Sequence, residues 1–286
     1  MNMIVRKIEG DFSTAKIDWI PNDPELAQFW NAVSLGLPLL EGYMIRAVSQ
    51  AKRELPESRA DLKNDCEMFC RQEANHTKAH MKFNEVVRDS GRYPKLDEHI
   101  ERLRDDYKRM DASRDAKDAL LYSEGFETVG PILAAYFLVQ ANKRLTEQDV
   151  DLVTLSLWRW HLSEEFEHRC VAFNAVEALY GAYWARIAGI ARAGTHLARF
   201  AISLSEYMLS EDIKAGRVAG GMAGRLRKTR SYASMLGFII PRVASACMPW
   251  YNPKNLKSPA GCDAVLKIAS ETLDLNAMAL RARDTV

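Results

Sequence analysis

The chain has 286 residues, and its 39 lysines and arginines almost balance its 38 aspartates and glutamates, which gives a formal net charge of +1. A dedicated nucleic-acid-binding protein normally carries a clear basic excess, so this balance argues against nucleic acid as a partner. Hydrophobic residues make up 48% of the chain and charged residues 27%. This is the composition of a core-forming globular protein and excludes a disordered one.

We expect neither a secretory leader nor a transmembrane segment. Residues 1–8 include no apolar core segment, and the longest uncharged run, 128–142, has 15 residues. A membrane-spanning helix needs about 20 predominantly apolar residues. The five cysteines form an odd set without the spacing of a disulfide framework. We therefore expect a reduced, cytoplasmic protein.

Helix is the dominant signal along the first part of the chain. Pro38 lies inside the first predicted helix and should kink it. Ser58 with Asp61, and Thr146 with Asp149, resemble capping boxes that open the second and fourth helices. Four long helices are expected, over about 23–54, 58–90, 118–142 and 146–180.

The remaining segments are shorter or less regular. Residues 214–230 contain six basic residues, four glycines and no acid, which predicts a mobile connector. Helical character is also expected over 97–117, 183–209, 231–250 and 263–283. We expect an all-α protein with an N-terminal arm (1–22), a four-helix bundle (23–182) and C-terminal helices (183–286) that pack on the bundle in the same structural unit.

Two Glu-x-x-His motifs contain the main candidate functional residues. Glu73 and His76 lie one helical turn apart on the second helix, as do Glu165 and His168 on the fourth. His161 falls within about 60° of the latter pair around the helix axis. Both motifs sit close to the apolar residues of their helices, where carboxylates and imidazoles are costly to bury unless they bind a charged partner. A metal cluster would be such a partner.

The first and third helices each offer an acid in an apolar context. Two single acids plus two Glu-x-x-His motifs form the ligand plan of the ferritin-like di-iron and di-manganese carboxylate bundles. Mixed oxygen and nitrogen ligation suits iron or manganese more than zinc. We expect two iron ions, with manganese or a mixed iron–manganese pair as the alternative. The predicted ligands are Glu41, Glu73, His76, Glu124, His161, Glu165 and His168.

Three further residues are candidates for supporting roles. His80 lies on the same face as Glu73 and His76, and we expect it beside the ligands or in the substrate pocket. Glu164 is a solvated or supporting residue in this interpretation. Glu127 is an alternative to Glu124 as the ligand from the third helix. His161 is either a ligand or a hydrogen-bond partner of a carboxylate.

Two family resemblances bear on these residues. The spacing His161-x-x-x-Glu165-x-x-His168 resembles the ligand set of the di-iron arylamine N-oxygenases. A wider resemblance is to the bacterial family labelled "predicted metal-dependent hydrolase". It is carried by Pro-x-x-Glu41, Glu73-Ala-x-His76-Thr-x-x-His80-x-x-x-Asn84, Trp160-His161-x-x-Glu164-Glu165-x-Glu167-His168 and the Tyr251-Asn-Pro region.

The third helix departs from the family pattern. Members of that family usually carry Glu-His-Phe-Thr there, whereas this chain has Glu124-Gly125-Phe126-Glu127. Glu124 matches the acid of the motif, but Gly125 replaces the histidine. The departure leaves open whether Glu124 or Glu127 is the ligand.

The expected function is an O₂-activating di-iron oxidase or oxygenase acting on a small-molecule or acyl substrate, with an electron donor that the sequence does not identify. A metal-dependent hydrolase is the first alternative, and a non-enzymatic metal-binding helical protein is the second. The basic and apolar region 214–250 leaves peripheral contact with a membrane surface as an open alternative. Bundles of this type often dimerise, so a homodimer is an alternative to a monomer.

Overall fold

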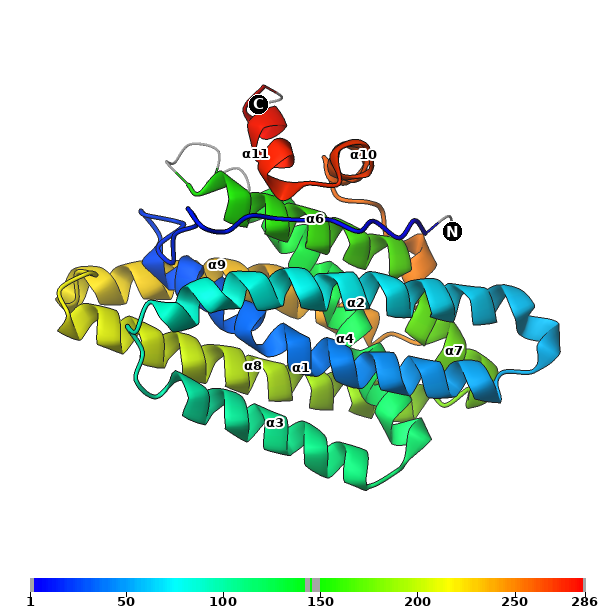
Figure 1. The fold of residues 1–286 in the computed structure, drawn as a ribbon. Coiled ribbons are helices and arrows are strands. Elements are labelled where there is room, and N and C mark those ends of the chain that lie inside the picture. Colours follow the sequence, from blue (N-terminus) through cyan, green and yellow to red (C-terminus); the bar gives the residue numbers. More distant parts are fainter. Residues whose placement is uncertain (1–2, 142–144, 146–149, 285–286) are drawn as a thin grey trace.

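The computed structural model describes residues 3–141, 145 and 150–284, and helices dominate them (Figure 1). Within these residues there is no β-strand, and one isolated parallel bridge joins Glu9 to Asp274. The predicted all-α class is confirmed. No helix among the described residues combines the length and apolar character needed to cross a membrane.

Four helices surround the centre of the molecule: α1 (Pro24–Glu54), α2 (Ala60–Asp89), α4 (Ala116–Ala135) and α6 (Leu152–His168). The start of α1 follows from its sequence, because the Asp23 side chain accepts a hydrogen bond from the amide of Leu26 and Pro24 opens the helix. Pro38 is accommodated inside α1 without ending it. The core between these helices includes Trp30, whose ring packs on Phe137 and Trp158 at centroid distances of 4.9 and 4.7 Å.

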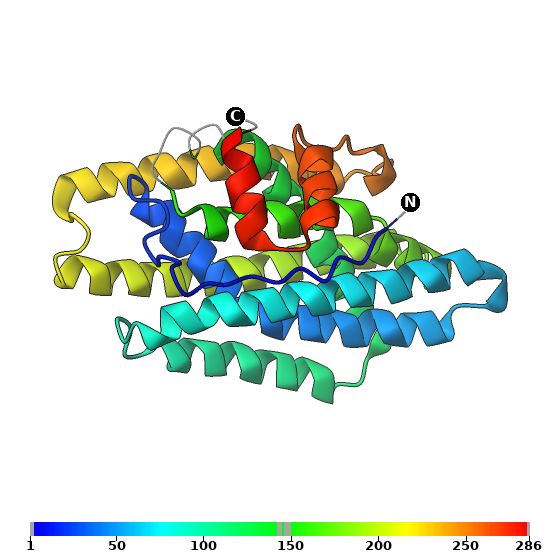
Figure 2. The same cartoon turned by 45° about the horizontal axis from the view of Figure 1, so that its top comes forward.

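The other elements pack around this centre. The hairpin of α8 (Tyr183–Lys214) and α9 (Gly221–Ala246) lies along α1 and α4 (Figures 1 and 2). The N-terminal arm runs along α2 and is tied to α11 through Glu9 (Figure 2). The remaining elements are η1 (Glu57–Arg59), α3 (Leu96–Ala112), the π-helical segment η2 (Tyr136–Ala141), α7 (Val171–Leu179), η3 (Pro253–Asn255), α10 (Cys262–Thr272) and α11 (Leu275–Asp284).

Several predicted helix boundaries were wrong. The expected cap at Ser58 does not form, because Ser58 lies in the short η1 turn and α2 starts at Ala60 without a side-chain cap. Residues 146–149, where the fourth helix was expected to begin, lie outside the described residues. The helix α6 begins at Leu152, where Asp151 accepts a hydrogen bond from the amide of Thr154, and it ends at His168 before the separate α7.

The predicted connector over 214–230 was also wrong in extent. Only 215–220 connect the two helices, and α9 starts at Gly221. The glycines that suggested mobility serve the turn, since Gly216 and Gly221 have φ values of 71° and 70°. The predicted last helix is divided into α10 and α11 at Leu273, which adopts a left-handed conformation with φ of 52°.

The crossing of α4 and α8 depends on two glycines. A Cβ atom at Gly125 would lie 2.4 Å from the carbonyl oxygen of Gly189, and a Cβ atom at Gly189 would lie 2.4 Å from that of Leu121. Both obstacles are backbone atoms, which cannot rotate away. This close approach explains why a side chain as large as histidine does not fit at position 125 and sets how α4 is held against α8.

We predict that Gly125→Ala lowers the free energy of unfolding by at least about 2 kcal/mol, because the helices must move apart to admit the methyl group. Gly237→Ala is the matched control. It lies in the exposed middle of α9 with open space around it, so alanine should stabilise the protein by about 0.5–1 kcal/mol. Urea unfolding of both variants tests this, and equal effects would contradict the close crossing.

Candidate metal centre

Helices α1, α2, α4 and α6 bring seven titratable side chains into one buried cluster. Each helix contributes at spacings that keep its residues on one face. None of the seven is more than 2% exposed. They are Glu41 from α1, Glu73 and His76 from α2, Glu127 from α4, and His161, Glu165 and His168 from α6.

The cluster contains two groups of potential metal ligands. Within each group the ligand atoms lie within 4.8 Å of one another. One group consists of Glu41, His76 and His161, and the other of Glu73, Glu165 and His168. A dinuclear site would need both groups to be close together and to share carboxylates.

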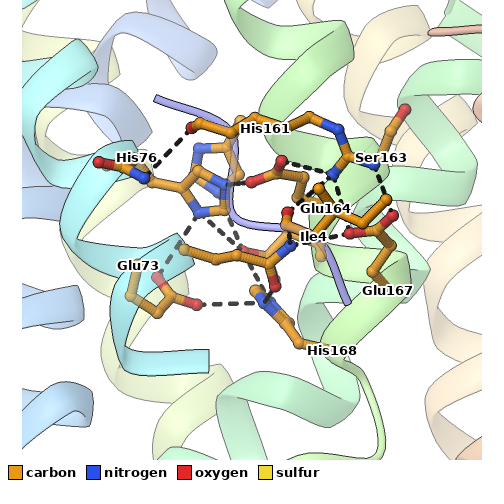
Figure 3. Close-up of polar contacts among 12 residues, drawn as sticks. Ile4, Glu73, His76, His161, Ser163, Glu164, Glu167 and His168 are labelled. Carbon is orange, nitrogen blue, oxygen red and sulfur yellow. Dashed lines mark hydrogen bonds and ion pairs between the residues drawn. The ribbon is translucent and has the colours of Figure 1, made fainter. Parts of the chain in front are cut away.

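Glu73 and Glu165 connect the two groups. The two oxygens of Glu73 face different histidines: Oε2 lies 3.7 Å from His76 Nδ1, and Oε1 lies 3.3 Å from His168 Nε2 (Figure 3). Glu165 Oε1 lies 3.0 Å from His161 Nε2 and 3.5 Å from His168 Nε2. Each carboxylate therefore occupies a position suited to bridging two cations.

Glu127 and Glu124 point in different directions from α4. Glu127 Oε2 lies 3.6 Å from His168 Nε2, inside the cluster. Glu124 instead accepts a hydrogen bond from Thr128 at 2.9 Å and lies 3.7 Å from the guanidinium of Arg186. Burial raises the pKa of Glu124 to about 7, partly offset by Thr128 and Arg186. The structure thus groups Glu127, and not Glu124, with the other acids.

Two of the three cluster histidines are held from outside by a hydrogen bond to the ring nitrogen that faces away from the carboxylates. His76 Nε2 lies 3.0 Å from Glu164 Oε2, and His168 Nδ1 lies 3.3 Å from Gln72 Oε1. Both acceptors hold a proton on the outer nitrogen. Burial lowers the pKa of His76 and of His168, but the neighbouring carboxylates outweigh it and raise both pKa values. A metal ion would therefore displace the proton on the inner nitrogen, Nδ1 of His76 or Nε2 of His168.

His161 is held by a chain of hydrogen bonds that fixes its tautomer. The Ser34 hydroxyl donates to Asn84 Oδ1 at 2.7 Å, so it accepts from Nδ1–H of His80 at 2.8 Å. His80 Nε2 is then the acceptor for Nδ1–H of His161, at 2.7 Å. Burial lowers the pKa of His80 well below its usual value, which keeps this ring neutral. His161 Nε2 is left with a lone pair directed at Glu165.

The inner nitrogens of the three imidazoles and the carboxylates of the cluster face one another. They lie 3.0–4.0 Å apart. Several inner atoms have no hydrogen-bond partner among the described residues: Glu41 Oε1, both oxygens of Glu73 and of Glu127, Glu165 Oε2, His76 Nδ1 and His168 Nε2. Buried polar atoms without partners are rare, and here they converge on one place. The donor set therefore fits metal ions, and the charge of two divalent cations would balance four carboxylates.

Protons partly take the place of that charge in the metal-free cluster. Burial, followed by repulsion from Glu73, raises the pKa of Glu41 well above its usual value. Burial, followed by repulsion from Glu165 and Glu73, does the same for Glu127. For Glu165 burial also acts upward, but the neighbouring histidines His168 and His161 outweigh it and lower the pKa.

The N-terminal arm completes the support of the cluster from outside. The Arg6 guanidinium, 3% exposed, donates to Glu164 at 2.8 Å and to both oxygens of Glu167 at 2.9 Å. Gln72 donates to Glu167 at 2.8 Å and to the carbonyl of Ile4 at 3.1 Å (Figure 3). The arm thus holds both residues that orient His76 and His168.

Of the ten residues singled out in the sequence, nine lie in or directly against the cluster, and Glu124 lies one turn away from it. His80 and Glu164 support histidines, and Glu164 is fully buried, so the alternative of a solvated Glu164 is wrong. The sequence analysis missed Arg6, Gln72 and Ser34. Ser34 had a detectable signal, because it lies seven residues before Glu41 and so shares its helix face. Arg6 lies outside the predicted helices, so no helical periodicity indicated that it would be near the cluster.

The comparisons agree with a metal-dependent protein. A family model described as "predicted metal-dependent hydrolase" matches residues 4–257. The chain belongs to this family. No curated protein and no solved structure matches the chain. The resemblance to the "predicted metal-dependent hydrolase" family is confirmed, and the buried ligand groups provide candidate sites for the metal that the family description implies.

We predict that metal affinity rises with pH, because metal ions must displace the protons that the raised pKa values of Glu41 and Glu127 retain. Competition for Mn²⁺ with a chelator, from about pH 6 to about pH 8, should show steadily tighter binding. Calorimetry in buffers of different ionisation enthalpy should detect proton release on binding. Affinity that does not change with pH, without proton release, would contradict the prediction.

Proposed function

We propose that this protein is a dinuclear metal enzyme that binds two iron ions and activates O₂ to oxidise an organic substrate. The observation that carries the proposal is the buried cluster of four carboxylates and three imidazoles from four helices. Two of those helices contribute Glu-x-x-His. This arrangement supports the ligand plan of the ferritin-like di-iron carboxylate proteins, and the third histidine supports the likeness to the arylamine N-oxygenases.

In this proposal the two groups hold one metal each. Glu41, His76 and His161 would hold the first, while Glu73, Glu165 and His168 would hold the second, to which Glu127 would add a further carboxylate. The set is rich in carboxylate oxygen and exceeds the four ligands typical of zinc, so it favours iron, with manganese or a mixed pair as the alternative.

The chain's own residues position the metal ligands, exclude water from them and balance the charge of the bound metals. Bound iron would supply the redox chemistry that O₂ reduction requires. Insertion of one oxygen atom into a substrate, with the other leaving as water, also draws two electrons and two protons from a separate reductant. The hydrogen bonds of Glu164, Gln72 and His80 hold the imidazoles in the tautomer that binds metal.

A metal-dependent hydrolase is the second candidate, and the family description favours it. A two-metal centre can activate a water molecule and polarise an acyl or phosphoryl oxygen. The site geometry offers less support, because its ligands are at most 2% exposed and the neighbouring cleft, described below, is apolar. Hydrolysis needs water and a polar scissile group at the metals.

Exchanging the α4 acids for their amides tests the ligand assignment. We predict that Glu127→Gln lowers the bound metal from two ions to about one per chain, since a neutral amide is a much poorer ligand. Glu124→Gln should retain both ions, because Glu124 faces Arg186. Mass spectrometry of metal content on folded, size-purified protein gives the answer, and the opposite pattern would assign the ligand to Glu124.

Oxygen consumption distinguishes the two activities. We predict near two iron ions per chain and rapid O₂ uptake after anaerobic reduction, both lost in His168→Ala. Hydrolysis of ester or phosphoester substrates by the zinc-loaded protein without O₂ would favour the hydrolase. Two bound metals with neither activity would favour a non-enzymatic metal-binding role, and no stoichiometric metal would overturn the dinuclear site itself.

A further inference from the structure

An elongated cleft of about 540 Å³ runs between α8 and α9, with α1 and α4 forming its floor. Its lining extends from Ile187 to Ile202 on α8, and from Met235 on α9 to Cys247, the residue after the end of that helix. At about 1.5 Å of rise per helical residue, these stretches are roughly 18–22 Å long. The volume falls within the range of roughly 300–1,000 Å³ that small-molecule sites occupy.

The chemistry of the lining restricts what the cleft can hold. Thr195 is the only described lining residue with a nitrogen or oxygen in its side chain, and its hydroxyl is already bonded to the carbonyl of Ala191 at 2.7 Å. A polar group inserted there would lose its bonds to water without replacement. The cleft is therefore suited to hydrocarbon.

The floor of the cleft adjoins the metal centre. Leu40 and Phe126 line the floor, and their chain neighbours Glu41 and Glu127 belong to the cluster. At Gly130, a Cβ atom would lie 2.8 Å from Glu165 Oε2 and 3.7 Å from the Phe126 ring. The absence of a side chain at this glycine brings the cleft wall close to a cluster carboxylate.

The rim of the cleft is apolar and its surroundings are basic. Ile202, Leu236 and Ile240 line the cleft and are 39%, 46% and 60% exposed. Helix α9 contains no acid. Its Arg227 and Lys228 pair with Glu25 and Glu206, whereas Arg242, next to the lining residue Val243, forms no ion pair among the described residues. An occupant with an apolar body and an anionic end would cover the rim and complement this charge.

The length and the apolar lining of the cleft favour a single alkyl chain as the occupant. A single alkyl chain is long, narrow and free of polar groups. It matches both the dimensions and the lining.

We propose that this cleft binds the hydrocarbon chain of a single-chain anionic amphiphile, of the fatty-acid type, beside the metal centre. The inference rests on the proposed function and deepens it by naming the substrate class. The chain comes either from free fatty acid or from a lipid in a bilayer.

Calorimetric titration of the full-length protein with hexadecanoate, dodecanoate and butanoate tests the proposal. We expect saturable binding of one hexadecanoate per chain, weaker binding of dodecanoate and none of butanoate. Ala198→Trp places an indole in the cleft from an exposed helical position and should weaken hexadecanoate binding at least about tenfold. Ala188→Trp, exposed on the same helix outside the cleft lining, should bind as the unchanged protein does.

Equal binding by the Ala198→Trp variant, equal affinity for butanoate, or no binding of hexadecanoate would overturn the proposal. Sedimentation with phosphatidylglycerol vesicles identifies the source of the chain: protein that sediments and is released by hexadecanoate takes its ligand from a bilayer, and protein that stays in solution takes it free. Vesicle binding that hexadecanoate does not reverse overturns the cleft as the site. Metal content, measured on the same samples, reports separately on the proposed function.

Discussion

The requirement to neutralise buried charge governs the centre of this protein. Four glutamates and three histidines lie within a core where isolated charges are strongly unfavourable, and their inner atoms face one another with few internal partners. Protons satisfy part of that requirement, and two divalent cations would satisfy it fully. The folded state is therefore expected to be coupled to metal binding, because a ligand that binds only the native state stabilises it.

The surrounding structure serves to keep seven side chains in a fixed arrangement. Each cluster histidine is oriented by a partner on its outer nitrogen. Arg6, in the N-terminal arm, in turn holds Glu164 and Glu167 through hydrogen bonds from its guanidinium. These two glutamates lie far from Arg6 in the sequence. Such bidentate ion pairs are geometrically specific, so the arm contributes precision to the site in addition to burial.

Two glycines of α4 permit close contacts on either side of this helix. Gly125 permits the close crossing with α8, and Gly130 leaves space for a cluster carboxylate. As a result α4 contributes both to the charge-dense centre, through Glu127, and to the floor of the apolar cleft, through Phe126. This juxtaposition is better suited to oxidation of an apolar substrate than to hydrolysis of a polar one, which is the physical basis for preferring oxygen chemistry within a family described by hydrolysis.

The sequence by itself determined the all-α class, the extents of α1 and α2 to within a few residues, and the faces of α2 and α6 that carry the Glu-x-x-His motifs. These features follow from helical periodicity, which is a local property. Only the tertiary structure decided that Glu127 joins the cluster while Glu124 meets Arg186, because periodicity does not fix how a helix is rotated against its neighbours. The same holds for Arg6 and for the cleft between α8 and α9, which arise from contacts between segments distant in the chain.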